Sequence, residues 1–376
     1  MRNQLNNQLN NQYRADHVGS FLRPQEILDA RNLHDDARLR EVEDRNIRAV
    51  LARQAELGFG ICTDGEFRRS TFMSDFTDSV EGFALDEDAI GYAWKADSSG
   101  AAAKTAPHQV TGIVAGKLRQ TRRLTASETP FLKANSTTDV KVTLPSPNQF
   151  PFISFKKGVT DKVYPNYSAL LADVVAILRG EVAALAADGV QYIQIDTPRY
   201  SYYIDPKWRE WLRTEIGVDP DVALDEAIAA DNACFDAARD AGVTLALHLC
   251  RGNNRGNWYA QGGYDAIAEK LFSGLRVDRF LLEFDDERSG TFEPLRFVPA
   301  GKTVVLGLVS TKRAEMERPA DLLRRVDEAS QYVPLENLAL SPQCGFASVM
   351  EGNPVTEETQ WAKLKLVADT ARQIWK

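Results

Sequence analysis

Short apolar segments alternate with longer amphipathic segments along most of this chain, and this alternation strongly restricts the folds open to it. Near-continuous apolar strands separated by helical patterns are typical of a parallel sheet covered on both faces. Eight strand patterns occur, at residues 14–18, 58–64, 140–144, 190–196, 243–250, 279–283, 303–309 and 337–341. Helical patterns occur at residues 24–57, 168–188, 223–241, 264–273, 320–332 and 357–375. We therefore predict an α/β protein that closes into a (β/α)8 TIM barrel.

An open, doubly wound sheet is the alternative fold. Its usual sign is a glycine-rich turn that follows a strand and begins a helix. Gly58-Phe59-Gly60 precedes a strand instead. We interpret it as an ordinary turn and retain the barrel.

Two segments do not fit the repeating pattern. Residues 1–13 are polar and of low complexity, without the apolar core of a signal peptide, which predicts a disordered tail. Residues 86–138 are rich in small residues and weakly periodic, which predicts a partly β insertion after the second strand. Within it we expect residues 110–118 to form a hairpin with residues 122–125. Residues 14–376 are otherwise predicted to be one catalytic barrel domain.

Candidate metal ligands lie at the ends of three predicted strands: His248, Cys250, Glu283 and Cys344. The carboxyl ends of barrel strands form the face that carries function, so we expect these side chains to meet. One imidazole, two thiolates and one carboxylate suit zinc, which accepts N, S and O donors. The alternative is a core histidine beside buried cysteines. We interpret Cys62 and Cys234 as packing residues of that kind.

Three further polar residues end predicted strands: Ser20, Glu66 and Asp196. Taken singly, each would be an ordinary residue of a solvated turn. Together, the two carboxylates suit a substrate ammonium, and the hydroxyl and backbone N–H of Ser20 suit a substrate carboxylate. These residues predict an amino-acid site.

The composition excludes several classes of partner. The net charge is -8 and no long Lys/Arg run occurs, which argues against nucleic acid and anionic membrane surfaces. No segment has an apolar run long enough to span a membrane. Four cysteines in 376 residues do not resemble a secreted disulfide scaffold. We expect a cytoplasmic protein that acts on a small molecule; the sequence carries no prediction of an oligomeric state.

Six segments, in this order, resemble the cobalamin-independent methionine synthase family. They are A-D-H-V-G-S-F-L-R-P, T-D-G-E-F-R-R-S, Y-I-Q-I-D, H-L-C-R-G-N, F-L-L-E-F-D-D-E-R-S-G and L-S-P-Q-C-G-F. The resemblance runs from about residue 14 to the end. It is to the short, single-barrel members, which are similar to the catalytic C-terminal half of the full-length enzymes.

The resemblance implies zinc on the four candidate ligands and recognition of an amino-acid thiol by Ser20, Glu66 and Asp196. Zinc converts a thiol, with a free pKa of about 8.5, into a thiolate nucleophile at neutral pH. Glu283 is the hard ligand in a soft set, so we expect it to yield to an incoming sulfur. The implied activity is a zinc-dependent S-methyltransferase that makes methionine from homocysteine.

Two departures from the family pattern concern the methyl donor. The family has Asp-Ile-His-Ser where this chain has residues 309–313, and that histidine is thought to protonate the leaving folate nitrogen. The tryptophan expected to stack on the pterin is absent from residues 144–150. We therefore do not expect a free folate as donor. Beyond the zinc site, no catalytic residue is assigned.

Other donors would need different contacts. Arg251, Arg255 and Lys312 are candidate contacts for an anionic donor, with a plain turn or a solvated lysine as the alternative. The signature D-x-H-x-x-G of corrinoid-binding modules does not occur. A corrinoid donor would have to arrive on a separate protein.

Two other functions stay open at this point. Alkyl transfer to another thiol, such as the opening of an epoxide by a sulfonate thiol, would use the same zinc. A non-catalytic zinc-binding protein would need the ligands but no amino-acid pocket.

Overall fold

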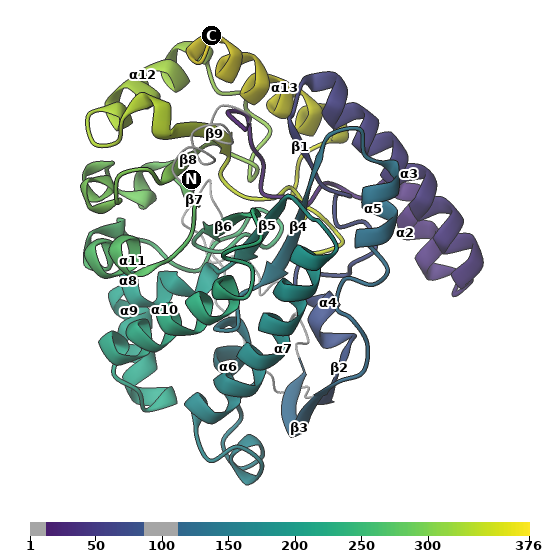
Figure 1. The fold of residues 1–376 in the computed structure, drawn as a ribbon, viewed down its shortest axis with the longest axis vertical. Coiled ribbons are helices and arrows are strands. Elements are labelled where there is room, and N and C mark those ends of the chain that lie inside the picture. Colours follow the sequence, from purple (N-terminus) through teal and green to yellow (C-terminus); the bar gives the residue numbers. More distant parts are fainter. Residues whose placement is uncertain (1–12, 86–111) are drawn as a thin grey trace.

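Seven parallel strands form one curled sheet in a computed structural model that describes residues 13–85 and 112–376 (Figure 1). Their order is β1-β4-β5-β6-β7-β8-β9. The bounds are β1 Ile61–Cys62, β4 Asp139–Pro145, β5 Tyr192–Asp196, β6 Thr244–Leu249, β7 Arg279–Glu283, β8 Thr303–Val309 and β9 Leu338–Pro342. The predicted α/β fold of the TIM-barrel class is confirmed, with seven strands in the sheet in place of eight.

The first predicted strand is reduced to a single bridge. Ala15 pairs in parallel with Leu340 of β9. The Asp16 N–H donates to the Leu340 carbonyl, and the Leu340 N–H donates to the Arg14 carbonyl, each over 2.9 Å. Side chains attach the segment more firmly, because Asp16 accepts a hydrogen bond from Lys141 of β4. An extended segment held by polar contacts thus lies where the first of the eight strands was predicted.

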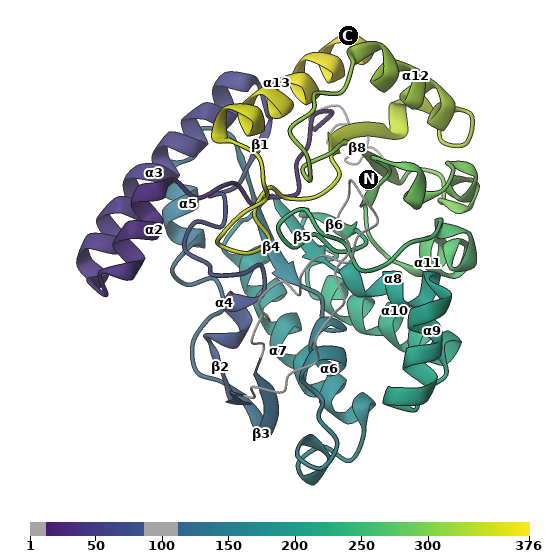
Figure 2. The same cartoon turned by 180° about the vertical axis from the view of Figure 1, so that it is seen from behind.

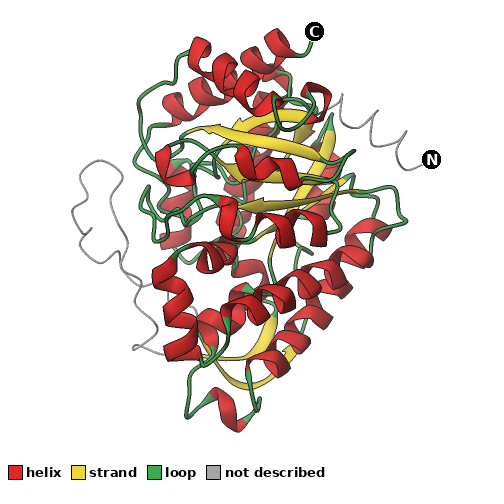
Figure 3. Ribbon diagram, turned by 90° about the vertical axis from the view of Figure 1, so that its left-hand side faces the viewer, coloured by secondary structure: helices red, strands yellow, loops and turns green. Residues whose placement is uncertain are grey.

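Helices surround the strands (Figures 1 and 2), so that yellow strands lie within a layer of red helices in Figure 3. The longer helices are α2 Gln25–Asn32, α3 Asp36–Leu57, α7 Tyr167–Ala187, α10 Pro220–Asp236, α12 Pro319–Ser330 and α13 Glu357–Ile374. The shorter ones are α4 Ser74–Thr77, α5 Thr129–Asn135, α6 Gln149–Ser154, α8 Ser201–Ile204, α9 Pro206–Trp211 and α11 Ala268–Gly274. No helix in the described part of the chain has the length and apolarity needed to cross a membrane.

The single helix predicted at residues 24–57 is wrong, because two helices occupy this range. His34 has a φ of 53°, a left-handed conformation that interrupts the helix. Asp35 then caps α3 by accepting a hydrogen bond from the Arg38 N–H over 3.0 Å. Helical periodicity continues across this break, so the sequence pattern did not reveal it.

The predicted hairpin of residues 110–118 with residues 122–125 is also wrong. The described part of the insertion contains β3 Ile113–Gln120, which pairs antiparallel with β2 Val80–Ala84. Residues 123–125 turn instead toward Glu181 of α7, which accepts hydrogen bonds from their polar groups. Residues 86–111 of the predicted insertion and residues 1–12 of the predicted tail lie outside the described residues. Tyr13, which we placed in the tail, is buried and donates to Asp139 Oδ2 over 2.6 Å.

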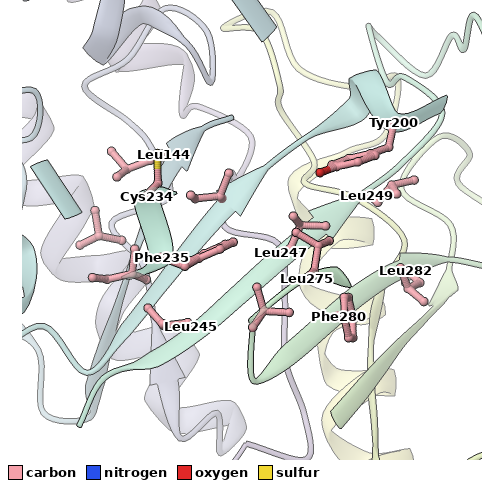
Figure 4. Packing of buried hydrophobic residues seen from close by; sticks show 14 of the residues in the cluster. Leu144, Tyr200, Cys234, Phe235, Leu245, Leu247, Leu249, Leu275, Phe280 and Leu282 are labelled. Atoms are coloured by element: carbon pink, nitrogen blue, oxygen red, sulfur yellow. The ribbon is translucent and has the colours of Figure 1, made fainter. Parts of the chain in front are cut away.

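Alternate residues of each strand face opposite sides of the barrel wall. On β6, Leu245, Leu247 and Leu249 face the helices, and Figure 4 shows them in the same packed layer as Phe235 of α10. Ala246 belongs to a separate apolar cluster in the barrel interior, and His248 follows it on the same face. Because the side chains of a strand alternate between its two faces, His248 points into the barrel interior.

A buried polar network fills the interior beneath the strand ends. The Lys141 ammonium is fully buried and lies 2.5 Å from Asp16 Oδ1 and 3.0 Å from Gln194 Oε1. Burial raises the pKa of Asp16, but Lys141 and Arg279 outweigh it and bring the pKa down to about 2. Gln194 also donates to Asp196 Oδ1 over 2.8 Å. The network thus supports the inward-facing residues at the carboxyl ends of the strands.

Candidate metal and thiol site

Three candidate ligands form one buried cluster. The ligand atoms of His248, Cys250 and Cys344 all lie within 4.8 Å of one another. His248 comes from the inner face of β6, Cys250 follows β6 directly, and Cys344 follows β9. Both ring nitrogens of His248 are buried and lack a hydrogen-bond partner among the described residues. Unpartnered imidazole nitrogens beside two thiols fit a metal ion such as zinc.

The two thiols of this cluster influence each other. Cys250 lowers the pKa of Cys344 well below its usual range, and His248 contributes in the same direction. Cys344 in turn raises the pKa of Cys250. The site therefore favours one thiolate, which is the form that binds metal.

Glu283, the fourth predicted ligand, ends β7 but is not part of this cluster of ligand atoms. Its Oε1 lies 2.8 Å from Lys312 Nζ, and its Oε2 accepts the Arg251 backbone N–H over 2.6 Å. Burial raises the pKa of Glu283, but Lys312 and Arg251 outweigh it and lower the pKa to about 2. The carboxylate is ionised and held by protein donors, and its coordination of a metal stays a prediction.

One pocket joins the metal cluster to the predicted thiol site. The predicted residues in its lining are Ser20, Glu66, Asp196, His248, Cys250 and Cys344. Six of the residues singled out at five separate strand ends are thus brought to a single cavity. Because both charged and apolar side chains line it, the pocket suits a small molecule that carries charged and apolar groups.

Glu66 adopts a strained backbone conformation at this pocket. Its φ is 59°, and Asp64 Oδ1 stabilises the turn by accepting the Glu66 N–H over 2.9 Å. Glu66 Oε1 accepts a hydrogen bond from the Thr143 hydroxyl over 2.8 Å, while Oε2 is buried without a partner among the described residues. Burial raises the pKa of Glu66, and Arg69 opposes this effect. A buried acceptor oxygen is thus left for a ligand donor.

Ser20 approaches the metal cluster because the residue after Cys344 is glycine. A Cβ atom on Gly345 would collide with Ser20 Oγ, so a larger residue would displace that hydroxyl. The Ser20 carbonyl also accepts the Phe346 N–H over 2.9 Å. The strand ends that carry Ser20 and Cys344 are therefore packed directly together.

Asp196 lies at the end of β5, the strand that pairs with β6, which carries His248. Its Oδ1 accepts a hydrogen bond from Gln194 Nε2, and its side chain is buried. Burial raises the pKa of Asp196 to about 7, although His248 lowers it. A buried carboxylate of this kind gains most from a cationic ligand.

The three candidate donor contacts do not line this pocket. The Arg251 guanidinium is fully buried and donates to the Gly262 carbonyl over 2.6 Å and to the Tyr264 hydroxyl over 3.2 Å. Arg255 is exposed, on a left-handed turn with a φ of 54°. Lys312 is buried against Glu283. Their placement gives no support to a contact with an anionic donor in this pocket.

Sequence reasoning missed other residues of the pocket wall. Arg199 lines the pocket while only 5% exposed, and its Nε donates to Gln149 Oε1 over 3.0 Å. The Arg199 guanidinium carbon also lies 5.3 Å from the centre of the Tyr259 ring. The available signal was position, because Arg199 follows Asp196 by three residues at the same strand end.

Known proteins are similar to this chain in sequence along most of its length. The family described as "Cobalamin-independent synthase, Catalytic domain" matches residues 15–373. The uncharacterized protein YxjH of Bacillus subtilis (strain 168) is 38% identical over 97% of this chain and 95% of its own length. A methionine synthase of Pyrococcus abyssi is 24% identical over 88% of this chain and 85% of its own length.

A solved structure agrees with these matches. It is a Listeria monocytogenes protein described as a candidate vitamin-B12-independent methionine synthase, with 30% identity and a TM-score of 0.68. The similarity covers 97% of this chain and 98% of that protein. The chain belongs to the family of the cobalamin-independent synthase catalytic domain, whose members are methyltransferases of the methionine synthase type.

Proposed function

We propose that this chain is a zinc-dependent S-methyltransferase that transfers a methyl group to the sulfur of homocysteine and forms methionine. The observation that carries the proposal is the shared pocket. It places two thiols and an imidazole with unpartnered ring nitrogens beside two buried carboxylates and a serine hydroxyl. This arrangement matches the thiol, ammonium and carboxylate of one small amino acid.

The zinc would be held by His248, Cys250 and Cys344. When bound, zinc lowers the pKa of a thiol from about 8.5 and makes the thiolate available as a nucleophile at neutral pH. This chemistry needs reduced cysteines, which are the rule in the cytoplasm, and all four cysteines are free.

The remaining residues orient the substrate. Glu66 Oε2 and the Asp196 carboxylate would accept hydrogen bonds from the ammonium, and the Ser20 hydroxyl would donate to the carboxylate. Holding the sulfur in line with the donor methyl converts a bimolecular encounter into a positioned reaction.

The donor, we infer, is more activated than free methyltetrahydrofolate, such as a methylated corrinoid on a separate protein or a sulfonium compound. Among the described residues that line the pocket, His248 is the only histidine and there is no tryptophan. Phe150, in the segment after β4 where the pterin-stacking residue was expected, stacks on Phe76 with ring centres 4.1 Å apart. A folate would therefore find neither a second histidine as acid nor an indole surface in that lining.

The pocket argues against a sulfonate thiol as the substrate. Glu66 and Asp196 present carboxylates to the cavity, and a sulfonate thiol without an amine has no ammonium group for them to bind. A pocket of this composition also has no purpose in a protein that only stores zinc.

Replacement of zinc by cobalt tests the proposed function. Homocysteine is expected to produce a new sulfur-to-cobalt charge-transfer band, whereas 2-mercaptoethanesulfonate at the same concentration should produce little. Retained cobalt whose spectrum does not respond to homocysteine would contradict the proposal.

A further inference from the structure

Glu66, the strained residue of the pocket, is held at one carboxylate oxygen by a threonine of β4. The Thr143 hydroxyl donates to Glu66 Oε1 over 2.8 Å, and both side chains are buried. Oε2 of the same carboxylate is buried without a partner among the described residues. Thr143 is not among the described residues that line the pocket, so we expect it to influence a ligand through Glu66.

Arg69 fixes the direction of this hydrogen bond. Its Nη1 donates to the Thr143 hydroxyl over 3.1 Å, and its Nη2 donates to the Thr143 carbonyl over 3.0 Å. A guanidinium can only donate, so the hydroxyl accepts from Arg69 and directs its own hydrogen to Glu66. Oε1 of Glu66 is therefore an acceptor for Thr143, and Oε2 is the oxygen left for a ligand.

A second carboxylate holds Arg69 in this orientation. Glu128 accepts hydrogen bonds from Arg69 Nε over 2.8 Å and from Nη2 over 2.6 Å, the paired contact typical of a guanidinium and a carboxylate. Asp75 Oδ2 also lies 3.7 Å from Arg69 Nη1. Glu128 lies between β3 and α5. A segment outside the barrel strands thus anchors the contact between Thr143 and Glu66.

The contact between Thr143 and Glu66 is also covered by the backbone of Gly19. Gly19 has a φ of 138°, and a Cβ atom on it would lie 2.9 Å from Thr143 Cγ2 and 3.4 Å from Glu66 Oε1. The close approach of this backbone leaves the threonine side chain little room to rotate. A hydrogen bond to a charged group is strong in such a buried site, because the local dielectric constant is low.

We propose that Thr143 is a positioning residue that fixes Glu66 Oε1 and so presents Oε2 to the ammonium group of the substrate. Through Glu66 it favours amino-acid thiols over thiols that lack an amine. The part of this inference that concerns the ammonium group rests on the proposed function. The orientation of Glu66 does not, because it depends only on contacts within the protein.

The first experiment titrates cobalt-loaded protein with homocysteine and with 4-mercaptobutyrate. Thr143→Val keeps the shape of the side chain and removes the hydroxyl. It is expected to weaken homocysteine binding by about tenfold, the size of effect of a hydrogen bond to a charged group, and to leave 4-mercaptobutyrate binding close to the wild-type value. Thr143→Ser keeps the hydroxyl and should resemble the wild type. Equal losses for both thiols, or unchanged homocysteine binding, in Thr143→Val would overturn the proposal.

A double-mutant cycle tests whether Thr143 acts through Glu66. In protein that already carries Glu66→Gln, Thr143→Val should weaken homocysteine binding little further, because the effects of two residues that act as a unit are not additive. Fully additive losses of homocysteine affinity would show that Thr143 acts by another route, and would overturn the proposal.

The orientation of Glu66 can be tested without any thiol. Crystal structures of the wild type, Thr143→Val and Thr143→Ser are expected to show the Glu66 carboxylate turned from its wild-type orientation only in Thr143→Val. An unmoved carboxylate in Thr143→Val would overturn the proposal. If homocysteine fails to perturb cobalt in the wild type, the proposed function fails, while these structures still decide whether Thr143 positions Glu66.

Thr125 provides a matched control for the loss of a buried hydroxyl. Its hydroxyl is buried and donates to Glu181 Oε1 over 2.7 Å, and neither residue is among the described residues of the pocket lining. Thr125→Val should leave the binding of both thiols unchanged even if it lowers the free energy of unfolding. A loss of homocysteine binding as large as that in Thr143→Val would show a general effect of destabilisation and would overturn the proposal.

Discussion

Asp196 and His248 are paired residues at the ends of the neighbouring parallel strands β5 and β6. Paired positions in a parallel ladder carry side chains on the same face, so both point into the barrel. A carboxylate suited to an ammonium therefore lies beside a metal ligand. This pairing fixes how the carboxylate and the metal ligand lie relative to each other.

Removal of one thiol should release the metal. Cys344→Ser is expected to lose most of its zinc while retaining the fold, because Cys344 belongs to the ligand cluster and follows β9 without being part of its strand. Metal analysis of protein purified under reducing conditions and without chelators gives the zinc content, and circular dichroism checks the fold. Cys234→Ser is the control, since Cys234 is buried against the sheet from α10 and should retain its zinc. Full zinc retention in Cys344→Ser would contradict the assignment.

The two pocket carboxylates should discriminate in favour of an amine. Asp196→Asn or Glu66→Gln is expected to weaken the binding of homocysteine by at least about 30-fold more than the binding of 4-mercaptobutyrate, which lacks the amine. The reason is that loss of one carboxylate leaves the buried ammonium unpaired, at a cost of about 2 kcal/mol or more. Titration of cobalt-loaded protein with each thiol measures the ratio. Asp231→Asn is the control, since this buried carboxylate accepts hydrogen bonds from Ser146 and Tyr200 outside the pocket. Equal losses for both thiols in the pocket variants would show that the carboxylates have another role.

Free methyltetrahydrofolate should be a poor donor. A methyl group on a tertiary folate nitrogen needs protonation of its leaving group, and absence of a positioned acid costs about 10²- to 10⁴-fold. A methylated corrinoid protein or a sulfonium donor should give faster thioether formation with homocysteine. Turnover with monoglutamyl methyltetrahydrofolate at about 1 to 10 per second, the ordinary enzymatic range, would contradict this expectation.

Acid should destabilise the barrel through Asp16. The pKa of Asp16 is lowered in the folded protein to about 2, so its ionised form stabilises the fold above the unfolded pKa of about 3.9. This stabilisation, of about 2 kcal/mol, is lost as the pH falls from about 4 through about 2. Wild type and Asp16→Asn should therefore differ in denaturant unfolding free energy at pH 7, and this difference should shrink below about pH 4 and nearly vanish as the pH approaches about 2.

A surface carboxylate provides the comparison for this prediction. Asp225 is 61% exposed and pairs with Lys270. Asp225→Asn should lie close to the wild type at every pH. A constant difference between wild type and Asp16→Asn from pH 7 to pH 2.5 would exclude the ion pair with Lys141 as its cause.

The sequence alone determined the fold class and six of the residues that line the pocket. A strand pattern can be recognised locally, because a strand that is buried on both faces needs a run of apolar residues. The carboxyl end of such a run marks the functional face of a barrel. Ser20, Glu66, Asp196, His248 and Cys344 were found in this way, because each ends a strand pattern or directly follows one.

Only the tertiary structure decided which charges pair. Lys312 and Glu283 are 29 residues apart and belong to different strand ends, and no local pattern distinguishes a solvated lysine from one buried against a carboxylate. The same limit applies to the pairing of β3 with β2 and to the single bridge of Ala15. Residue periodicity reports which face of an element is buried, whereas the partner on that face depends on contacts between segments far apart in the chain.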